Sequence, residues 1–159
     1  MTPQLLLAQD GQIAWLQYKG KGSFLQSSDL KSNLLEAAQS SKQVFLDLGL
    51  CEGMDSTFMG ILVSVAKSLT DDVQLELIYV NNSLQELMEG LGLQYFLTIK
   101  NDAGRAIDIE ASLKPKLEPV ETGAVINQDN IYTAHQTLSD MNPENANKFK
   151  DVLDAFDDE

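Results

Sequence analysis

Asp55 and Ser56 are the residues of this sequence whose types and position are best suited to chemistry. They follow a short apolar run, Val44 to Leu48, and a loop bracketed by Gly49 and Gly53, and a long apolar segment comes after them. Asp and Ser satisfy the free N–H groups in the first turn of a helix. The same N–H groups and the helix dipole attract phosphate. Ser56 is therefore either an inert helix cap or a phosphorylation switch.

Other reactive residues do not form a catalytic arrangement. Cys51 and His135 are the only cysteine and the only histidine, and a nucleophile pair would need them in contact with a third, orienting group. A partly buried thiol and an incidental helix histidine are the simpler interpretation. A zinc site needs more ligands than these two, and Asp47 with Asp55 makes neither a glycosidase nor a metal site. We predict that the protein is not an enzyme and uses no metal or cofactor.

The elements that must position Ser56 alternate between strands and helices. Gln4–Gln9 and Gln12–Tyr18 are predicted strands joined at Asp10–Gly11, a strong two-residue turn signal. The elements that follow are a helix from Ser27 or Ser28 to about Gln39, the strand and helix around Ser56, a strand Val73–Val80, a helix capped by Asn82 or Ser83, and a short strand Tyr95–Ile99. This order predicts an α/β fold with a mixed sheet of four to five strands and helices packed on it.

The helix that begins near Ser56 is apolar on more than one side. One side holds Met59, Leu62, Val63, Ala66 and Leu69, while Phe58, Ile61 and Val65 add further apolar surface. Such breadth predicts either burial on more than one side or an exposed apolar patch for a partner.

The last third of the chain differs in composition. Through Lys100 there are 6 basic and 11 acidic residues, and from Asn101 onward there are 5 and 13. Arg105–Ala111 alternates weakly and predicts an edge strand or an extended arm. Residues 112–127 contain Pro115 and Pro119 and are predicted to be a linker. We therefore divide the chain into a domain of residues 1–111, which we expect to fold alone, a linker of residues 112–127 and a helical extension of residues 128–159.

The extension is predicted to hold two helices. Asp129 or Asn130 can cap the first, which runs to Met141, and Asn142–Pro143 starts the second. Apolar residues of the second helix share one face, namely Ala146, Phe149, Val152, Leu153 and Phe156. This stripe must cover the domain's own surface, a second copy or a partner, and we favour packing within the chain or a homodimer.

Composition narrows the function classes. The 159 residues carry a net charge of −13 and are 43% hydrophobic, which argues against a nucleic-acid partner and favours a partner with a basic face. No stretch is long and apolar enough for a membrane span, and the first residues lack the basic region of a signal peptide. With a single cysteine there is no internal disulfide. We expect a cytoplasmic protein that does not act at a membrane.

The segment around Ser56 resembles the core motif of STAS domains, the fold of bacterial anti-sigma factor antagonists. The family motif reads roughly Met-Asp-Ser-Ser-Gly-Leu-Gly. Met54, Asp55, Ser56 and Gly60 match it, Thr57 stands for the second serine, Met59 stands for the leucine, and Phe58 replaces the first glycine. The order of elements from residue 4 to residue 100 also matches that family.

The resemblance implies a regulatory function in transcription that works through protein binding. The unphosphorylated protein would dock an anti-sigma factor that is also a serine kinase of histidine-kinase-like fold, and so release a sigma factor. The kinase would phosphorylate Ser56, whose hydroxyl we expect to be exposed, and a serine phosphatase would reverse the switch. The resemblance places the partner contacts at Met54, Asp55, Ser56, Thr57, Phe58 and Met59. Phe58 would either fill the core or present an apolar knob.

Two other functions remain open from the sequence. One is a structural or scaffold module that assembles through its apolar helix and C-terminal helices without phosphorylation. The other is a pocket for a nucleotide or lipid, which some STAS domains bind, although no residue pattern here marks such a pocket.

Overall fold

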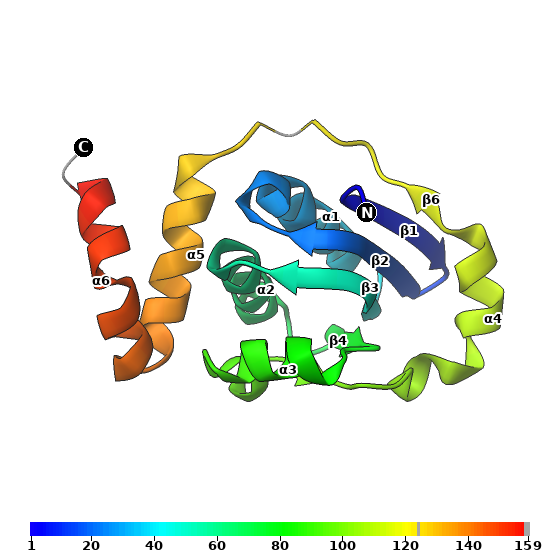
Figure 1. Cartoon of the computed structure of the whole chain (residues 1–159). Helices are drawn as coiled ribbons and strands as arrows, with labels where there is room; N and C mark the ends of the chain where they lie inside the picture. Colours follow the sequence, from blue (N-terminus) through cyan, green and yellow to red (C-terminus); the bar gives the residue numbers. More distant parts are fainter. Residues whose placement is uncertain (124, 158–159) are drawn as a thin grey trace.

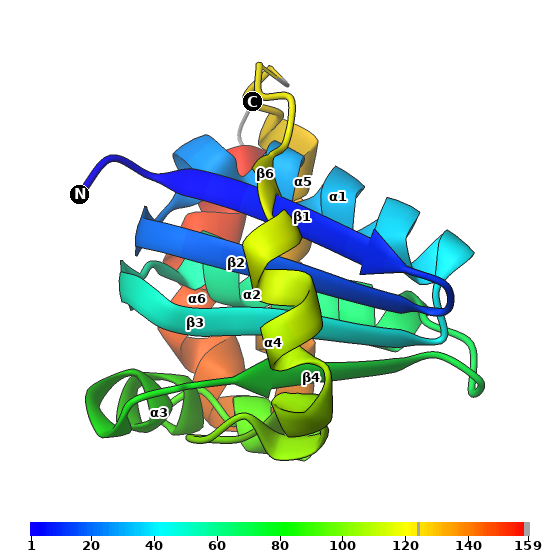
Figure 2. The ribbon, with the colours of Figure 1, turned by 90° about the vertical axis from the view of Figure 1, so that its right-hand side faces the viewer.

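A computed structural model describes residues 1–123 and 125–157, so the last two residues of the expected extension and one residue of the expected linker lie outside the described residues. The described chain forms an α/β fold with one mixed sheet of six strands in the order β5-β4-β3-β2-β1-β6 (Figures 1 and 2). The strands are β1 Gln4–Asp10, β2 Ile13–Gly22, β3 Gln43–Met54, β4 Gln74–Ile78, β5 Thr98–Ile99 and β6 Glu118–Pro119. The α/β class is confirmed, and the sheet is larger than the four to five strands predicted.

The strands pair as the alternating sequence requires. β1 and β2 form an antiparallel hairpin in which Asp10 pairs with Ile13, so that Gly11 and Gln12 make the turn. Gly11 has a φ of 59°, a left-handed conformation that glycine adopts without a steric penalty. β2, β3, β4 and β5 are mutually parallel, each joined to the next by a crossover, and β6 adds to β1 antiparallel.

Six α-helices accompany the sheet in the described residues. They are α1 Ser27–Ser40, α2 Ser56–Ser68, α3 Asn82–Glu89, α4 Glu110–Leu113, α5 Gln128–Met141 and α6 Pro143–Asp157. Short 3-10 turns occur at Phe24–Gln26, Leu93–Tyr95, Gly104–Asp108 and Lys114–Lys116. None of the described helices has the length and apolar character needed to cross a bilayer.

The segment Gly49–Gly53 is strand and not the loop that its glycines predicted. β3 continues to Met54 because β2 runs beside it to Gly22, and the two strands pair through register shifts in this region. Glycine tolerates such irregular pairing. Asp55 follows the C-terminal end of the extended β3 and lies directly beside the end of β2, where its N–H donates to the carbonyl of Gly22 at 2.8 Å.

Three predictions for residues 95–127 need correction. The short strand near Tyr95–Ile99 is reduced to Thr98–Ile99, preceded by a 3-10 turn. Arg105–Ala111 is neither strand nor extended arm: it belongs to a 3-10 turn and α4, because Ala106, Ile109 and Leu113 recur at helical spacing and pack on the sheet. The expected linker contains the sixth strand, β6.

The molecule is built in layers, which Figure 1 shows from the side. α1 and α2 pack on one face of the sheet, α5 lies over α2, and α6 lies over α5. The segment with α4 covers the opposite face, as Figure 2 shows. The apolar stripe of α6 packs within the chain in part: Phe149 lies against His135 and Phe156 against Tyr132, both residues of α5, whereas Ala146 and Val152 are exposed.

Truncation tests the domain boundary at residue 111, which stays a prediction. Leu113 is fully buried and Leu117 packs beside it, and burial of one leucine contributes about 1.5–3 kcal/mol. We expect a chain that ends at residue 121 to melt cooperatively, and a chain that ends at residue 111 to melt at least about 5 °C lower. Both lack α5 and α6, so circular dichroism melting curves isolate residues 112–121. Equal melting temperatures would place the boundary at 111.

Candidate functional site

Asp55 fixes the start of α2. Its backbone is extended, with φ −89° and ψ 175°, and its Oδ1 accepts the N–H of Phe58 at 2.8 Å, which makes it the N-cap residue. Its Oδ2 accepts the N–H of Phe24 at 2.8 Å. The carboxylate therefore joins two chain segments, the 3-10 turn after β2 and the first turn of α2. Asp55 holds Ser56 in place as the first residue of the helix.

The hydroxyl of Ser56 is not free, although the sequence predicted that it would be exposed. It lies 2.9 Å from Nε2 of His135 in α5, and Nδ1 of His135 lies 2.8 Å from the carbonyl oxygen of Ile131. Since a carbonyl can only accept, Nδ1 of His135 donates that bond, and in the tautomer that carries its single proton on Nδ1 the Nε2 atom accepts the proton of Ser56. Ser56 is half-buried and His135 is only 6% exposed.

Gly60, one helical turn after Ser56, lets α2 and α5 come close enough for the contact between Ser56 and His135. A Cβ atom built on Gly60 would lie 2.7 Å from the carbonyl carbon and 2.8 Å from the Cα of Ala134. Real Cβ atoms do not approach backbone atoms so closely, and only glycine lets the two helices meet here. Gly60 and Ser56 are four residues apart and share a face of α2. Gly60, the glycine of the motif, thus packs directly against the backbone of α5 in the same chain.

Phe58 fills the core instead of presenting an apolar knob. It has no exposed surface, and its ring packs edge-on against Tyr18 with centroids 4.8 Å apart. A Cβ atom on Gly22 would lie 2.7 Å from the ring. The ring therefore occupies space that Gly22 leaves open at the end of β2.

Of the six residues predicted to contact a partner, the structure leaves only two accessible. Asp55 and Ser56 are half-buried, whereas the other four are buried in the described structure, namely Met54, Thr57, Phe58 and Met59. No local pattern in the sequence connects His135 with Ser56. Only its place on the inner face of an amphipathic helix, beside Ala134 and Leu138, could have indicated it.

Cys51 takes no part in the hydrogen bond between His135 and Ser56. It is buried, and its Sγ lies 3.4 Å from the carbonyl oxygen of Gly53. Burial raises the pKa of the thiol above its usual value, so little of the reactive thiolate forms near neutral pH. Within residues 1–123 and 125–157, no three His, Cys, Asp or Glu side chains converge in a way that could hold a metal ion.

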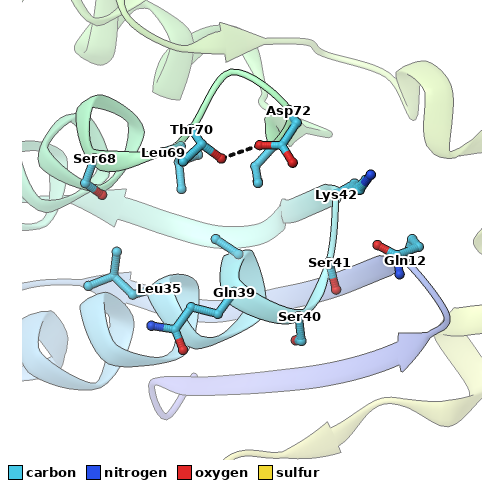
Figure 3. A pocket seen from close by; sticks show the side chains of 12 residues that line it. Gln12, Leu35, Gln39, Ser40, Ser41, Lys42, Ser68, Leu69, Thr70 and Asp72 are labelled. Carbon is cyan, nitrogen blue, oxygen red and sulfur yellow. Dashed lines mark hydrogen bonds between the residues drawn. The ribbon is translucent and has the colours of Figure 1, made fainter.

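A surface hollow of about 550 Å³ lies at the other end of α2, away from Ser56 (Figure 3). It opens between the C-terminal ends of α1 and α2 and the start of β3 and β4, and Thr70 donates a hydrogen bond to Asp72 at its rim. Its lining mixes polar and apolar residues: Gln12, Leu35, Ala38, Gln39, Ser40, Ser41, Lys42, Ser68, Leu69, Thr70, Asp72 and Val73.

Sequence comparison decides the family. Residues 4–106 match the model of the STAS domain family. The chain belongs to the STAS domain family. No curated protein matches the chain by sequence.

Solved structures with this STAS fold include anti-sigma factor antagonists. One from Mycobacterium paratuberculosis is 13% identical with a TM-score of 0.59, covering 71% of this chain and 95% of its own. Unphosphorylated SpoIIAA is 12% identical with a TM-score of 0.54, covering 70% and 97%. The phosphorylated form of the Bacillus cell fate determinant SpoIIAA is 12% identical with a TM-score of 0.52, covering 68% and 98%. At these identities the likeness is one of fold.

A double-mutant cycle tests the fit between Gly22 and Phe58. We expect Gly22→Ala to destabilise the protein by about 1–3 kcal/mol through overpacking, and Phe58→Ala by about 3–5 kcal/mol through the cavity it leaves. In the double variant the methyl group added at position 22 finds space, so the combined loss falls below the sum of the single losses. Urea unfolding measures each free energy.

Gly53→Ala is the matched control, since a Cβ atom there meets nothing within 4 Å, and it should change stability by no more than about 0.5 kcal/mol. Strict additivity of Gly22→Ala and Phe58→Ala would show that the two positions do not share space.

Proposed function

We propose that this STAS domain is a regulatory module of the anti-sigma factor antagonist type, which acts by binding and is switched by phosphorylation of Ser56. The observation that carries the proposal is the position of Ser56. It is the first residue of α2, directly behind the Asp55 cap, where the family motif has its acceptor serine. The similarity in fold to SpoIIAA, a protein solved in both unphosphorylated and phosphorylated forms, supports the same assignment.

The partner proposed is an anti-sigma factor that is also a serine kinase using ATP. In the transfer step, Oγ of Ser56 attacks the γ-phosphorus, the bond to the bridging oxygen of ADP breaks, and the hydroxyl proton passes to a base on the kinase. A serine phosphatase returns the hydroxyl by hydrolysis. We propose that the protein binds its partner in the cytoplasm.

Phosphorylation changes the surface at the start of α2 in a direction that weakens docking. A phosphoryl group adds about −1.5 to −2 charges at neutral pH. Asp55 is adjacent and Glu52 is exposed nearby, three residues before Asp55. The added charge raises the cost of removing this surface from water when a partner covers it. The N-terminus of α2 itself tolerates the charge, so the fold survives the modification.

Two substitutions at Ser56 test the switch. Ser56→Ala should lose at most about 0.5–2 kcal/mol of stability, accept no phosphate from the kinase and ATP, and keep binding to the unmodified partner. Ser56→Asp should fold as well, but bind more than tenfold more weakly, which is about 1.4 kcal/mol. Intact-mass analysis of protein from its native cells and titration against candidate kinases of the histidine-kinase-like class supply the measurements.

Ser64→Ala is the matched control, because Ser64 is a half-buried serine on the same helix whose hydroxyl bonds the Ile61 carbonyl at 3.0 Å. It should accept phosphate and bind like the unchanged protein. If native protein carries no phosphate and the Ala and Asp variants of Ser56 bind equally, Ser56 is an ordinary first-turn residue and the switch is wrong.

A further inference from the structure

The C-terminal helix pair (α5 and α6, residues 128–157) occupies the place where a partner would meet Ser56. Helical spacing puts Ser56, Met59, Gly60 and Val63 on one face of α2, and this covered face lies against α5. Met59 is 3% exposed and Val63 has no exposed surface. A kinase that binds residues around Ser56 would need the same face.

We propose that the C-terminal helix pair is a removable cover that regulates access to Ser56. This inference rests on the proposed function of Ser56 as a phosphate acceptor. In the closed state α5 occupies the covered face, and in the open state the face is free for the kinase. The arrangement in Figure 1 is the closed state.

The cover is held by a small set of buried side chains. Along α5 these are Ala134, His135 and Leu138, along α6 they are Asn145 and Phe149, and α6 packs chiefly on α5. Polar contacts add to this packing: Asn130 bonds Ser28 and Lys31, each at 3.2 Å, and the buried Asn145 donates to the carbonyl of Leu91 at 2.8 Å. Such bonds can be exchanged for bonds to water at small net cost.

The connection to the domain permits opening without unfolding the sheet. Between β6 and α5 the chain is exposed at Glu121–Gly123 and at Val125–Asn127. A Cβ atom on Gly123, whose φ is 118°, would meet nothing within 4 Å. In this segment the carbonyl of Val125 accepts a hydrogen bond from Ser28 at 3.1 Å, and no strand of the sheet follows it among the described residues.

Phosphorylation and closure compete for the same space. Oγ of Ser56 has the imidazole of His135 as its neighbour at 2.9 Å. With the Ser56 side chain in this rotamer, a phosphoryl group on Oγ would overlap the imidazole ring of His135. Closure therefore disfavours phosphorylation, and phosphorylation disfavours closure to the same extent, because coupling between two binding events is reciprocal.

Oxidation of Met59 by hydrogen peroxide measures opening in the full chain without any partner. Met59 lies on the covered face, and peroxide converts an accessible thioether to the sulfoxide. We expect His135→Ala to raise the Met59 oxidation rate by about two- to tenfold, the range for one lost hydrogen bond. Gly60→Ala should raise it by more, because its methyl group meets the backbone of α5. Peptide mass spectrometry gives the rate at each methionine.

The chain supplies its own controls. Met88 has no exposed surface and lies in α3, three residues before the Leu91 carbonyl that Asn145 of the cover bonds, while Met1 is exposed. If opening is local, Met1 should keep its rate in every variant and Met88 should change less than Met59, and Gly53→Ala should behave like the unchanged protein. The cover is refuted if Met59 oxidises at the same rate in all variants, or if Met88 accelerates in parallel with Met59, since the latter shows unfolding of the whole domain.

An assay of phosphate transfer from the kinase to Ser56 then tests whether opening of the cover controls phosphorylation. His135→Ala leaves α2 and Ser56 unchanged in sequence, and we expect it to speed phosphate transfer to Ser56 by the same factor as Met59 oxidation. Faster oxidation with an unchanged transfer rate would refute regulation by the cover. If Ser56 accepts no phosphate in the unchanged protein or in either variant, the proposed function fails and the regulation inferred from it fails too, whereas the oxidation data still establish that the helix pair opens.

Discussion

The structure depends on the enclosure of one helix from two sides. In α2 the residues from Thr57 to Val63 are buried without interruption, and Val65 is buried as well. Seven consecutive residues span almost two turns, so no side of this part of the helix faces water. A sheet can cover only one face of a helix, and α5 covers the other. Without that layer, the STAS domain would expose an apolar surface of the kind that binds partners or aggregates.

Patterns in the sequence correctly predicted the features that depend on residues close together in the chain. The hairpin turn at Gly11, the start of α2 at Asp55 and Ser56 and the alternation of strands and helices all depend on neighbours within a few residues. The breadth of apolar residues in α2 also predicted burial on two sides as one of two outcomes. The sequence could not choose between that outcome and an exposed patch, since the choice depends on where a distant helix packs.

Features that arise from contacts between distant residues were missed. Gly49–Gly53 is strand because β2 pairs with it, and a glycine-rich stretch carries no sign of that pairing. The contact of Ser56 with His135 joins residues 79 positions apart, and neither residue type is unusual in a helix. Phe58 replaces the family glycine because Gly22 leaves the space for its ring. In each case the contact between two segments distant in sequence decided the local structure, and the conformational propensity of the residues did not.

The short segment between β6 and α5 gives the cover a high effective concentration at its own docking face. A tethered group that can reach its site behaves like a free ligand at roughly millimolar concentration for a short flexible connection. Any partner that binds the same face from solution competes with that local concentration, even when the direct contacts of α5 are weak. Lengthening or shortening the segment around Gly123 would therefore tune how strongly a partner must bind, without altering a single residue at the interface.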